Sequence, residues 1–210
     1  SEVINAFNQI KEDPLKVISQ IDILENNEVN YYNVRANIST DKISNAARFI
    51  FLNKTCYNGI YRVNKKGKFN VPYGHNKFVT IYERDNLFAA SKALINASIK
   101  CQDFEKCLVN IEKGDLVFLD PPYTVAHNNN GFLEYNQKIF TWNDQKRLAD
   151  FVNEIKNKKA YFLLTNGVHK CIVKLYGKLG KRYELDRYST ITSRIGKRKK
   201  ISEYLFTNCV

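Results

Sequence analysis

The segment DLVFLDPPY, at residues 115–123, constrains the fold of this chain more than any other stretch. Its four consecutive apolar residues predict a buried strand, and the Asp-Pro-Pro-Tyr that follows predicts an abrupt end to that strand. Proline fixes the backbone and donates no N–H group, so the two prolines leave carbonyl oxygens pointing outward. Because ligands of open α/β sheets bind at the carboxyl ends of strands, the segment predicts a ligand site there.

Asp120, Pro121, Pro122 and Tyr123 together suit a planar base that carries an exocyclic amine. The Asp120 carboxylate and the Pro121 carbonyl can accept the two hydrogens of the amine, while the Tyr123 ring stacks on the base. The lone pair of the nitrogen is then directed at an electrophile by positioning rather than by a strong base. The alternative is a simple turn after a strand, and the net charge of +12 favours the functional interpretation.

Basic residues outnumber acidic ones, 33 to 21, and the sequence pI is near 9.4. This surplus predicts attraction to a phosphate-rich partner, most simply nucleic acid, although an ordinary basic enzyme fits the same composition. The five cysteines form no CxxC pair and the three histidines lie far apart, so no metal site is predicted. No stretch approaches the roughly 18 apolar residues of a membrane span, and the odd cysteine count fits a reducing compartment, so the expected location is the cytoplasm.

Hydrophobic periodicity divides the chain into a helical first part and an α/β second part. Helical spacing of apolar residues covers most of the first fifty residues. Thr141 and Asp144 form a capping-box pattern at the start of a later helix. Continuous apolar strands separated by helices predict a mainly parallel sheet that is covered on both faces. The strands are predicted at residues 97–104, 115–119, 160–166, 182–190 and 201–208, and the helices between them at residues 141–159 and 169–179.

Residues 51–74, FLNKTCYNGIYRVNKKGKFNVPYG, lead from a helical pattern into an alternating one. Two short strands are predicted at residues 60–63 and 68–71, joined by the four-residue loop Asn-Lys-Lys-Gly. Lysine, arginine, asparagine and tyrosine side chains recur along the segment. The segment is therefore either a β-hairpin whose polar side chains only face solvent, or a hairpin that recognises a polyanion.

The chain resembles the Dam-type DNA adenine-N6 methyltransferases, which use S-adenosylmethionine and carry a DPPY motif. LDPPY and the segment at residues 51–74 carry the resemblance, and YYNVRANIS, FLEYNQKIFTWNDQ, LLTN and SRIGKRKKISEYL match in the family's order. The resemblance implies an α/β fold, a Rossmann-like methyltransferase sheet with a helical target-recognition subdomain. Residues 1–96 would form that subdomain, with a DNA-reading β-hairpin at residues 57–74, and residues 97–210 would form the C-terminal part of the catalytic domain.

The resemblance also implies roles for residues of the catalytic part. An adenine flipped out of double-stranded DNA would enter the pocket, with Asn166 helping to line it. S-adenosylmethionine would lie against Asp103, Phe104 and Asp120. The catalytic residues implied are Asp120, Pro121, Pro122 and Tyr123.

In the hairpin, Arg62 would donate a bidentate pair to a guanine edge in the major groove, and Ile60 would touch a neighbouring base. Tyr57 and Asn58 would enter the stack that the adenine leaves. The hairpin resembles those that read GATC, while each lysine taken singly is as well explained by solvation. The further DNA contacts implied, most of them to phosphates, are Lys54, Asn64, Lys65, Lys66, Lys68, Pro72, Arg194, Lys197, Arg198, Lys199 and Lys200.

Part of the family's pattern is missing. Family members begin with a lysine-containing segment, a strand, a Phe-x-Gly-x-Gly loop and a second strand, and none of these occurs here. Because those two strands are central in the family's sheet, the strands that end at Asp103 and Asp120 would have unpaired edges. The sheet is therefore expected to be incomplete, with its first two strands absent. We expect the chain to belong to a longer protein, or to pair with a second chain that completes the cofactor site.

The expected function is site-specific adenine-N6 methylation of double-stranded DNA, with GATC as the first candidate target, in a restriction–modification, phage or housekeeping setting. A catalytically inactive DNA-binding remnant, or a subunit that needs a separate cofactor-binding segment, is the alternative. The missing glycine loop favours that alternative and the intact Asp-Pro-Pro-Tyr opposes it. Methylation of RNA or of cytosine N4 uses the same chemistry at an exocyclic amine, and the hairpin argues for DNA and adenine.

Overall fold

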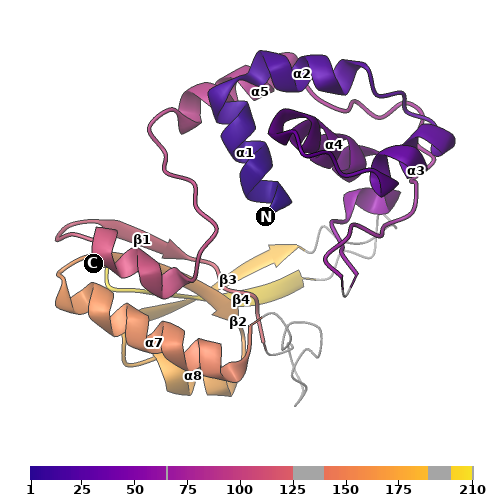
Figure 1. Ribbon diagram of the computed structural model, residues 1–210. Coiled ribbons are helices and arrows are strands. Elements are labelled where there is room, and N and C mark those ends of the chain that lie inside the picture. Colours follow the sequence, from indigo (N-terminus) through magenta and orange to yellow (C-terminus); the bar gives the residue numbers. More distant parts are fainter. Residues whose placement is uncertain (65, 125–139, 189–199, 210) are drawn as a thin grey trace. The chain divides into compact units, whose positions relative to one another are not determined.

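A computed structural model describes residues 1–64, 66–124, 140–188 and 200–209 of the chain (Figure 1). The chain divides into two compact units, Ser1–Cys101 and Gln102–Val210, so the division falls slightly later than the boundary predicted after residue 96. The first unit is helical, and the second contains a four-stranded sheet with helices.

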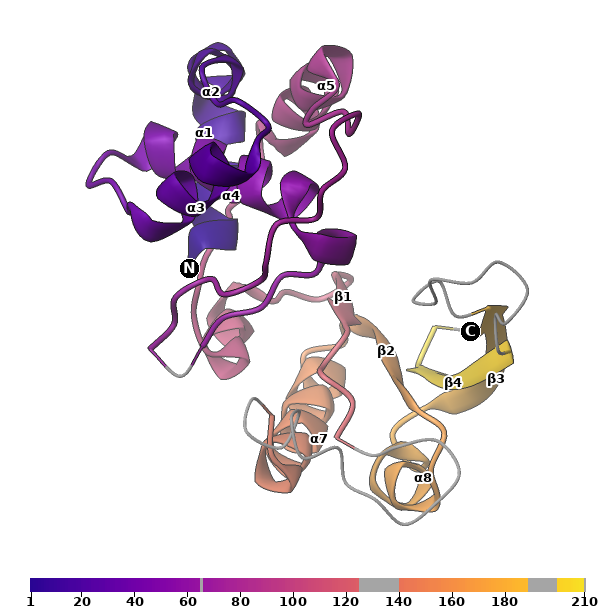
Figure 2. The same ribbon diagram turned by 90° about the vertical axis from the view of Figure 1, so that its right-hand side faces the viewer.

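Four of the five described α-helices of the first unit begin at a residue whose side chain caps them, and the last, which follows Glu83, has no such cap. Asp13 accepts a hydrogen bond from the backbone N–H of Lys16, and Pro14 occupies the first turn of the helix, where a missing N–H costs nothing. Asp41 accepts from the backbone N–H of Ser44 in the same way. The helices are α1 (Glu2–Glu12), α2 (Pro14–Asp22), α3 (Glu28–Ala36), α4 (Lys42–Thr55) and α5 (Arg84–Leu94), as Figure 2 shows.

Two apolar clusters form the core of the first unit. One joins α1, α2 and α4 through Ala6, Ile10, Val17, Ile21, Ala46 and Ala47. The other surrounds the buried Tyr31 and Phe51 and includes Phe69, Val71 and Tyr73 from the segment after α4. Because these three residues alternate along the chain, that arm turns one face toward the helices and the other away from them.

The regular strands predicted at residues 60–63 and 68–71 do not form. The segment instead has two isolated antiparallel bridges, Cys56 to Tyr73 and Val63 to Phe69. A side chain takes the place of some backbone hydrogen bonds between the two arms, since Asn64 Oδ1 accepts from the backbone N–H groups of Lys66 and Lys68. The first arm opens with the short 3₁₀ helix η1 (Tyr57–Gly59).

The sheet of the second unit has the order β1-β2-β4-β3. β1 (Leu116–Leu119) pairs with β2 (Tyr161–Gly167) in parallel, whereas β4 (Lys200–Thr207) pairs antiparallel with both β2 and β3 (Lys181–Tyr188). The prediction of a mainly parallel sheet is therefore wrong for these strands, because β3 and β4 pair with each other as an antiparallel ribbon. The helices are η2 (Phe104–Asn110), α7 (Trp142–Asn157) and α8 (Lys170–Tyr176).

The strand predicted at residues 97–104 does not form. Residues 97–102 have no regular structure, and Asp103 caps the 3₁₀ helix η2 by accepting from the backbone N–H of Glu105. A strand is stable only with a neighbour that pairs with its backbone groups, and none of the described strands pairs with this segment. The apolar residues of this segment alone therefore did not predict its secondary structure correctly.

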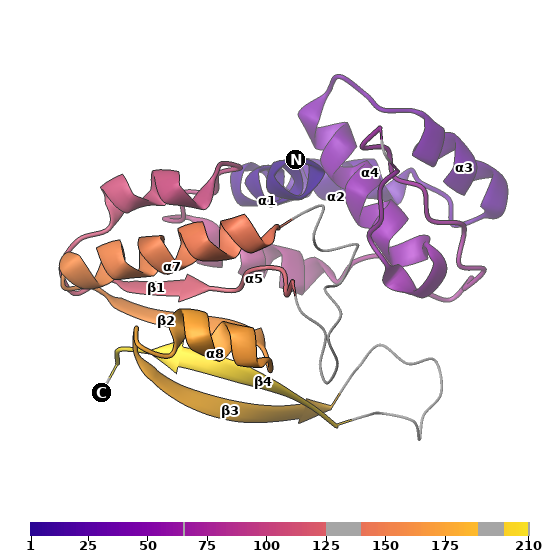
Figure 3. The same ribbon diagram turned by 90° about the horizontal axis from the view of Figure 1, so that it is seen from below.

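The two faces of the sheet differ. Phe162 and Leu164 of β2 and Phe206 of β4 are fully buried against α7 and α8, which lie on the same side of the sheet (Figure 3). On the opposite face, Leu116 and Phe118 of β1 are 59% and 62% exposed, and their register partners on β2 share that face. Among the described residues, only one face of the sheet is therefore well covered, not both as predicted.

Candidate active site

Asp120 and Tyr123 lie in one cavity at the end of β1. Thr165 Oγ1 donates a hydrogen bond of 2.6 Å to Asp120 Oδ1, and the Tyr123 hydroxyl donates one of 3.1 Å to Glu203 Oε2. The cavity has a volume of about 290 Å³, and it is lined by these four residues and Phe118. The cavity thus carries two carboxylates, two hydroxyls and two aromatic rings, and a ligand site at this strand end stays a prediction.

The pairing of the strands explains how these side chains meet. Leu119 is the register partner of Leu164, so the next residues along the two parallel strands, Asp120 and Thr165, are neighbours. Glu203 is opposite Gly167 in the antiparallel pair of β2 and β4. Gly167 and Thr165 lie two positions apart on β2, so Glu203 shares the face that carries Thr165.

The environment of Tyr123 keeps its phenol protonated. Burial raises the pKa of Tyr123 to about 12, and the negative charges of Glu203 and Asp120 act in the same direction, while a hydrogen bond with Thr165 opposes them. At neutral pH the phenol is therefore a hydrogen-bond donor, consistent with its contact to the Glu203 carboxylate.

A buried polar network supports the loop from the helical side of the sheet. Gln145 of α7 is fully buried, and its Nε2 lies 3.5 Å from the carbonyl oxygen of Pro122, at the limit of a hydrogen bond. Gln145 Oε1 accepts from Asn166 Nδ2 at 3.1 Å and from the Tyr176 hydroxyl at 2.6 Å. Asn166, which was expected to line the pocket, is instead fully buried in this network, because alternation along β2 turns it to the face opposite Thr165.

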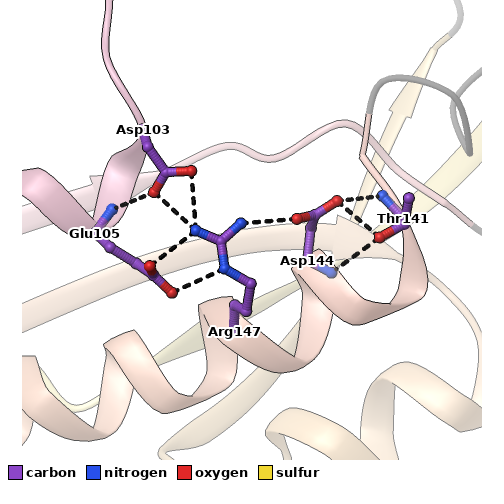
Figure 4. Close-up of polar contacts among 5 residues, drawn as sticks. All are labelled: Asp103, Glu105, Thr141, Asp144 and Arg147. Atoms are coloured by element: carbon purple, nitrogen blue, oxygen red, sulfur yellow. Dashed lines mark hydrogen bonds and ion pairs between the residues drawn. The ribbon is translucent and has the colours of Figure 1, made fainter.

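Asp103 and Phe104, the predicted cofactor contacts, surround Arg147 of α7. The Arg147 guanidinium pairs with Asp103 and Glu105 of the η2 segment and with Asp144 of α7, at distances of 2.8 to 2.9 Å (Figure 4). It also lies 5.0 Å from the centre of the Phe104 ring. Hydrogen bonding to Arg147 lowers the pKa of Asp103, and the acidic partners raise that of Arg147.

This cluster holds η2 against the start of α7, where Thr141 and Asp144 form the predicted capping box. Both Asp103 oxygens accept from Arg147 Nη2, so the carboxylate is held in a fixed orientation while its side chain stays 42% exposed. An oriented, half-exposed carboxylate beside an aromatic ring fits an adenine amine as hydrogen-bond donor. It is compatible with one edge of a nucleoside site.

The predicted DNA contacts of the hairpin lie on its outer side. Arg62 is exposed, and its Nε donates to Asn70 Oδ1 at 2.9 Å within the hairpin. Asn58 adopts a left-handed backbone conformation, with φ of 54°, and is flanked by the half-exposed Tyr57. The remaining described members of the predicted set, all exposed, are Lys54, Ile60, Asn64, Lys66, Lys68 and Pro72. Lys65, Arg194, Lys197, Arg198 and Lys199 lie outside the described residues, and of Lys200 only the backbone, in β4, is described.

Three residues of this site were missed by the sequence interpretation: Thr165, Glu203 and Gln145. Thr165 lies in LLTN, next to the asparagine predicted to line the pocket, and Glu203 lies in ISEYLFTN, a segment predicted only to form a strand. A signal was available for both, since a polar residue that interrupts an apolar strand near its end is typical of a site at the sheet edge.

The sheet, its helical cover and the Asp-Pro-Pro-Tyr loop are consistent with a methyltransferase fold. Residues 1–191 match the family described as D12 class N6 adenine-specific DNA methyltransferase, and the chain belongs to this family of DNA-modifying enzymes.

Named relatives agree with this assignment. The chain is 34% identical to the Type II methyltransferase M.MjaIII of Methanocaldococcus jannaschii, over 89% of this chain and 68% of that protein. It is 33% identical to the Type II methyltransferase M1.LlaDCHI of Lactococcus lactis subsp. cremoris, over 99% of this chain and 76% of that protein. A DNA adenine methylase of Salmonella typhi is 28% identical over 98% of this chain and 75% of that protein. Type II methyltransferases and a DNA adenine methylase are thus both among its relatives.

Among the described helices, none has the length and apolar character that crossing a membrane requires. The described residues also contain no group of three or more histidine, cysteine, aspartate or glutamate side chains placed to bind a metal ion.

Proposed function

We propose that this DNA adenine-N6 methyltransferase takes its methyl group from S-adenosylmethionine and acts on an adenine that has been flipped out of duplex DNA. The observation that carries the proposal is the cavity at the end of β1, in which Asp120 and Tyr123 lie together. A base inside a duplex cannot reach such a cavity, so the adenine has to leave the stack first.

Within the cavity, the chain's own residues would orient the base. The Asp120 carboxylate and the Pro121 carbonyl accept the two hydrogens of the N6 amine, and the Tyr123 ring stacks on the purine. Bound S-adenosylmethionine supplies an electrophilic methyl group. Holding both amine hydrogens aims the nitrogen lone pair at that group, so the rate gain comes from positioning and desolvation.

The cofactor would lie against Asp103, Phe104 and Asp120. The orientation of Asp103 by Arg147 supports this proposal, because it leaves a fixed acceptor at a half-exposed position. The engagement of both carboxylate oxygens with Arg147 means that the cofactor's amine would share Asp103 with the guanidinium rather than displace it.

The first unit would select the target sequence. We propose that residues 1–96 form a target-recognition subdomain whose hairpin, residues 57–74, enters the major groove. Arg62 would exchange its internal contact to Asn70 for a guanine edge, as a base-reading arginine does. The exposed lysines of the hairpin would contact phosphates and give affinity without sequence preference. GATC is the target we would test first.

The sheet would be completed by strands outside the described set. β1 is an edge strand of the described sheet, with β2 as its neighbour, and Leu116 and Phe118 expose apolar surface on the poorly covered face. Unpaired edges and apolar faces of this kind favour association with another chain segment. We propose that a further segment of a longer protein, or a second chain, pairs with β1 and completes the cofactor site.

The deciding experiment measures transfer of a labelled methyl group from S-adenosylmethionine to a GATC duplex. The matched substrate is the same duplex with N6-methyladenine already present at the target positions, and Asp120→Ala is the matched variant. With the segment that completes the cofactor site present, we expect transfer to the unmodified duplex only, and a loss of roughly 100-fold or more in Asp120→Ala.

Calorimetry with S-adenosylmethionine, with and without the duplex, identifies the cause if transfer is not seen. Salt-dependent DNA binding without cofactor binding would mean that the chain is the DNA-reading half of the enzyme. Cofactor binding and DNA binding without transfer would contradict the proposed role of the cavity.

A further inference from the structure

We infer that Glu203 is a positioning residue that fixes the ring of Tyr123 for stacking on the substrate base. This inference rests on the proposed function, since it concerns the same cavity. It adds to the Asp-Pro-Pro-Tyr segment a residue from β4, which lies far away in the sequence.

Tyr123 is held at both of its ends. The Tyr123 hydroxyl donates to Glu203 Oε2 at 3.1 Å, and both residues line the cavity together with Asp120. The backbone end of Tyr123 is held by the two prolines that precede it, whose φ angles are restricted. Anchoring the hydroxyl as well fixes the direction of the axis from Cβ to the phenol oxygen, so the ring is held at one place in the cavity before any base arrives.

Glu203 is placed by a paired strand rather than by a loop. It lies within β4, opposite Gly167 of β2, and is thus held by a strand paired on both sides. Gly167 carries no side chain that could compete with Glu203 for the space beside the cavity. A side chain on a paired strand is placed more accurately than one on a loop, which suits a residue that orients another.

The charge of Glu203 also favours its contact with Tyr123. A carboxylate is a strong acceptor for a phenol, and the charge of Glu203 contributes, after burial, to holding Tyr123 in its protonated form. The phenol therefore donates to Glu203 at neutral pH. Stacking on a base depends on where the ring lies, so a fixed hydroxyl would favour the productive position of the ring over positions swung away from the cavity.

A purely structural role for Glu203 makes a different prediction. If the carboxylate only stabilised the sheet, its loss would lower the free energy of unfolding and leave the kinetics of the folded protein unchanged. If it positions Tyr123, its loss would slow methyl transfer without weakening DNA binding, and a residue that keeps the acceptor oxygen would restore the rate.

The test compares Glu203→Ala with Glu203→Gln, which retains an oxygen that can accept from the phenol. Glu184→Ala, on the neighbouring strand β3, is the matched control because it removes an exposed glutamate from the same sheet. We expect the single-turnover rate to fall roughly 10- to 100-fold in Glu203→Ala, with unchanged affinity for the duplex, and to recover largely in Glu203→Gln. Equal rates in Glu203→Ala and wild type would overturn the inference.

A second measurement separates this inference from the proposed function. In protein labelled with ¹³C at tyrosine Cζ, the Tyr123 signal is assigned by its absence in Tyr123→Phe and observed without DNA or cofactor. We expect Glu203→Ala to move this signal, Glu203→Gln to move it less, and Glu184→Ala to leave it in place. An unmoved signal in Glu203→Ala would contradict the inference whether or not the protein methylates DNA. A moved signal in a chain that transfers no methyl group would support the contact and count against the proposed reaction instead.

Discussion

Gln145 and Asn166, both fully buried, are joined by a hydrogen bond of 3.1 Å from Asn166 Nδ2 to Gln145 Oε1. This contact connects α7 to β2 directly behind the loop that carries Asp120 and Tyr123. Because the Gln145 amide also lies close to the Pro122 carbonyl and accepts from Tyr176, one side chain ties the loop to two helices and a strand. The active-site loop therefore depends on a polar core residue as well as on its own prolines.

Replacing Gln145 by leucine should destabilise the second unit. The substitution leaves the buried Asn166 amide without its acceptor, whereas the Tyr176 hydroxyl keeps the backbone carbonyl of residue 145 at 2.9 Å. An unsatisfied buried polar group costs about 1–3 kcal/mol. Urea unfolding of Gln145→Leu should show this loss of free energy, whereas Asn157→Ala, at the exposed end of the same helix, should change it by less than about 0.5 kcal/mol. Equal stability of the two variants would show that the network contributes little.

The ion pairs of Arg147 should make stability depend on acid pH. Hydrogen bonding to Arg147 lowers the folded-state pKa of Asp103, and contacts with Thr141 and then Arg147 lower that of Asp144, both from an ordinary value of 3.8. A carboxyl whose pKa is lower in the folded state contributes stability above its unfolded pKa, and this contribution is lost as the pH falls through the folded one.

The free energy of unfolding of wild type and of Arg147→Gln should therefore differ most near neutral pH and converge below pH 3.8. Because the Arg147 and Asp103 side chains are 39% and 42% exposed, the difference should be modest and should shrink at high salt. Lys146→Gln, a charge-matched change at the preceding position of α7, should show no such convergence. A pH-independent difference for Arg147→Gln would indicate that the ion pairs act through packing alone.

Arg62 and Lys66 should contribute to DNA binding in different ways. Arg62→Ala should lose about 1–3 kcal/mol of discrimination between the target duplex and one with a changed guanine, because a bidentate contact to a base edge is lost. Lys66→Ala should weaken binding to all duplexes alike and reduce the slope of log K against log salt by about one. Lys16→Ala, on α2, is the control, since Lys16 pairs with Asp13 within its own helix turn. Titrations of labelled duplexes over a range of salt concentrations measure all three. If Arg62→Ala weakened binding to all duplexes equally, Arg62 would not contribute to sequence discrimination.

Local patterns in the sequence determined several elements of this protein. The helix that begins after Thr141 was predicted with its capping box, because the bonds between Thr141 and Asp144 involve residues three apart and need no tertiary partner. The apolar run before Asp120 formed the strand β1, which ends at the two prolines because they donate no N–H group. The prediction that this strand is buried is wrong for the described residues, since Leu116 and Phe118 are mostly exposed.

Tertiary structure decided the rest, because pairing between strands is not encoded within either strand alone. Residues 97–104 have the apolar pattern of a strand but pair with none of the described strands. The antiparallel pairing of β3 with β4 makes the described sheet mixed rather than mainly parallel. The position of Glu203 beside Tyr123 depends on the register of β4 against β2, which brings together residues far apart in the chain. The sequence alone determined which residues could form a site at the strand end, and the register of the sheet decided which of them meet there, since a shift of one residue would turn each side chain to the other face.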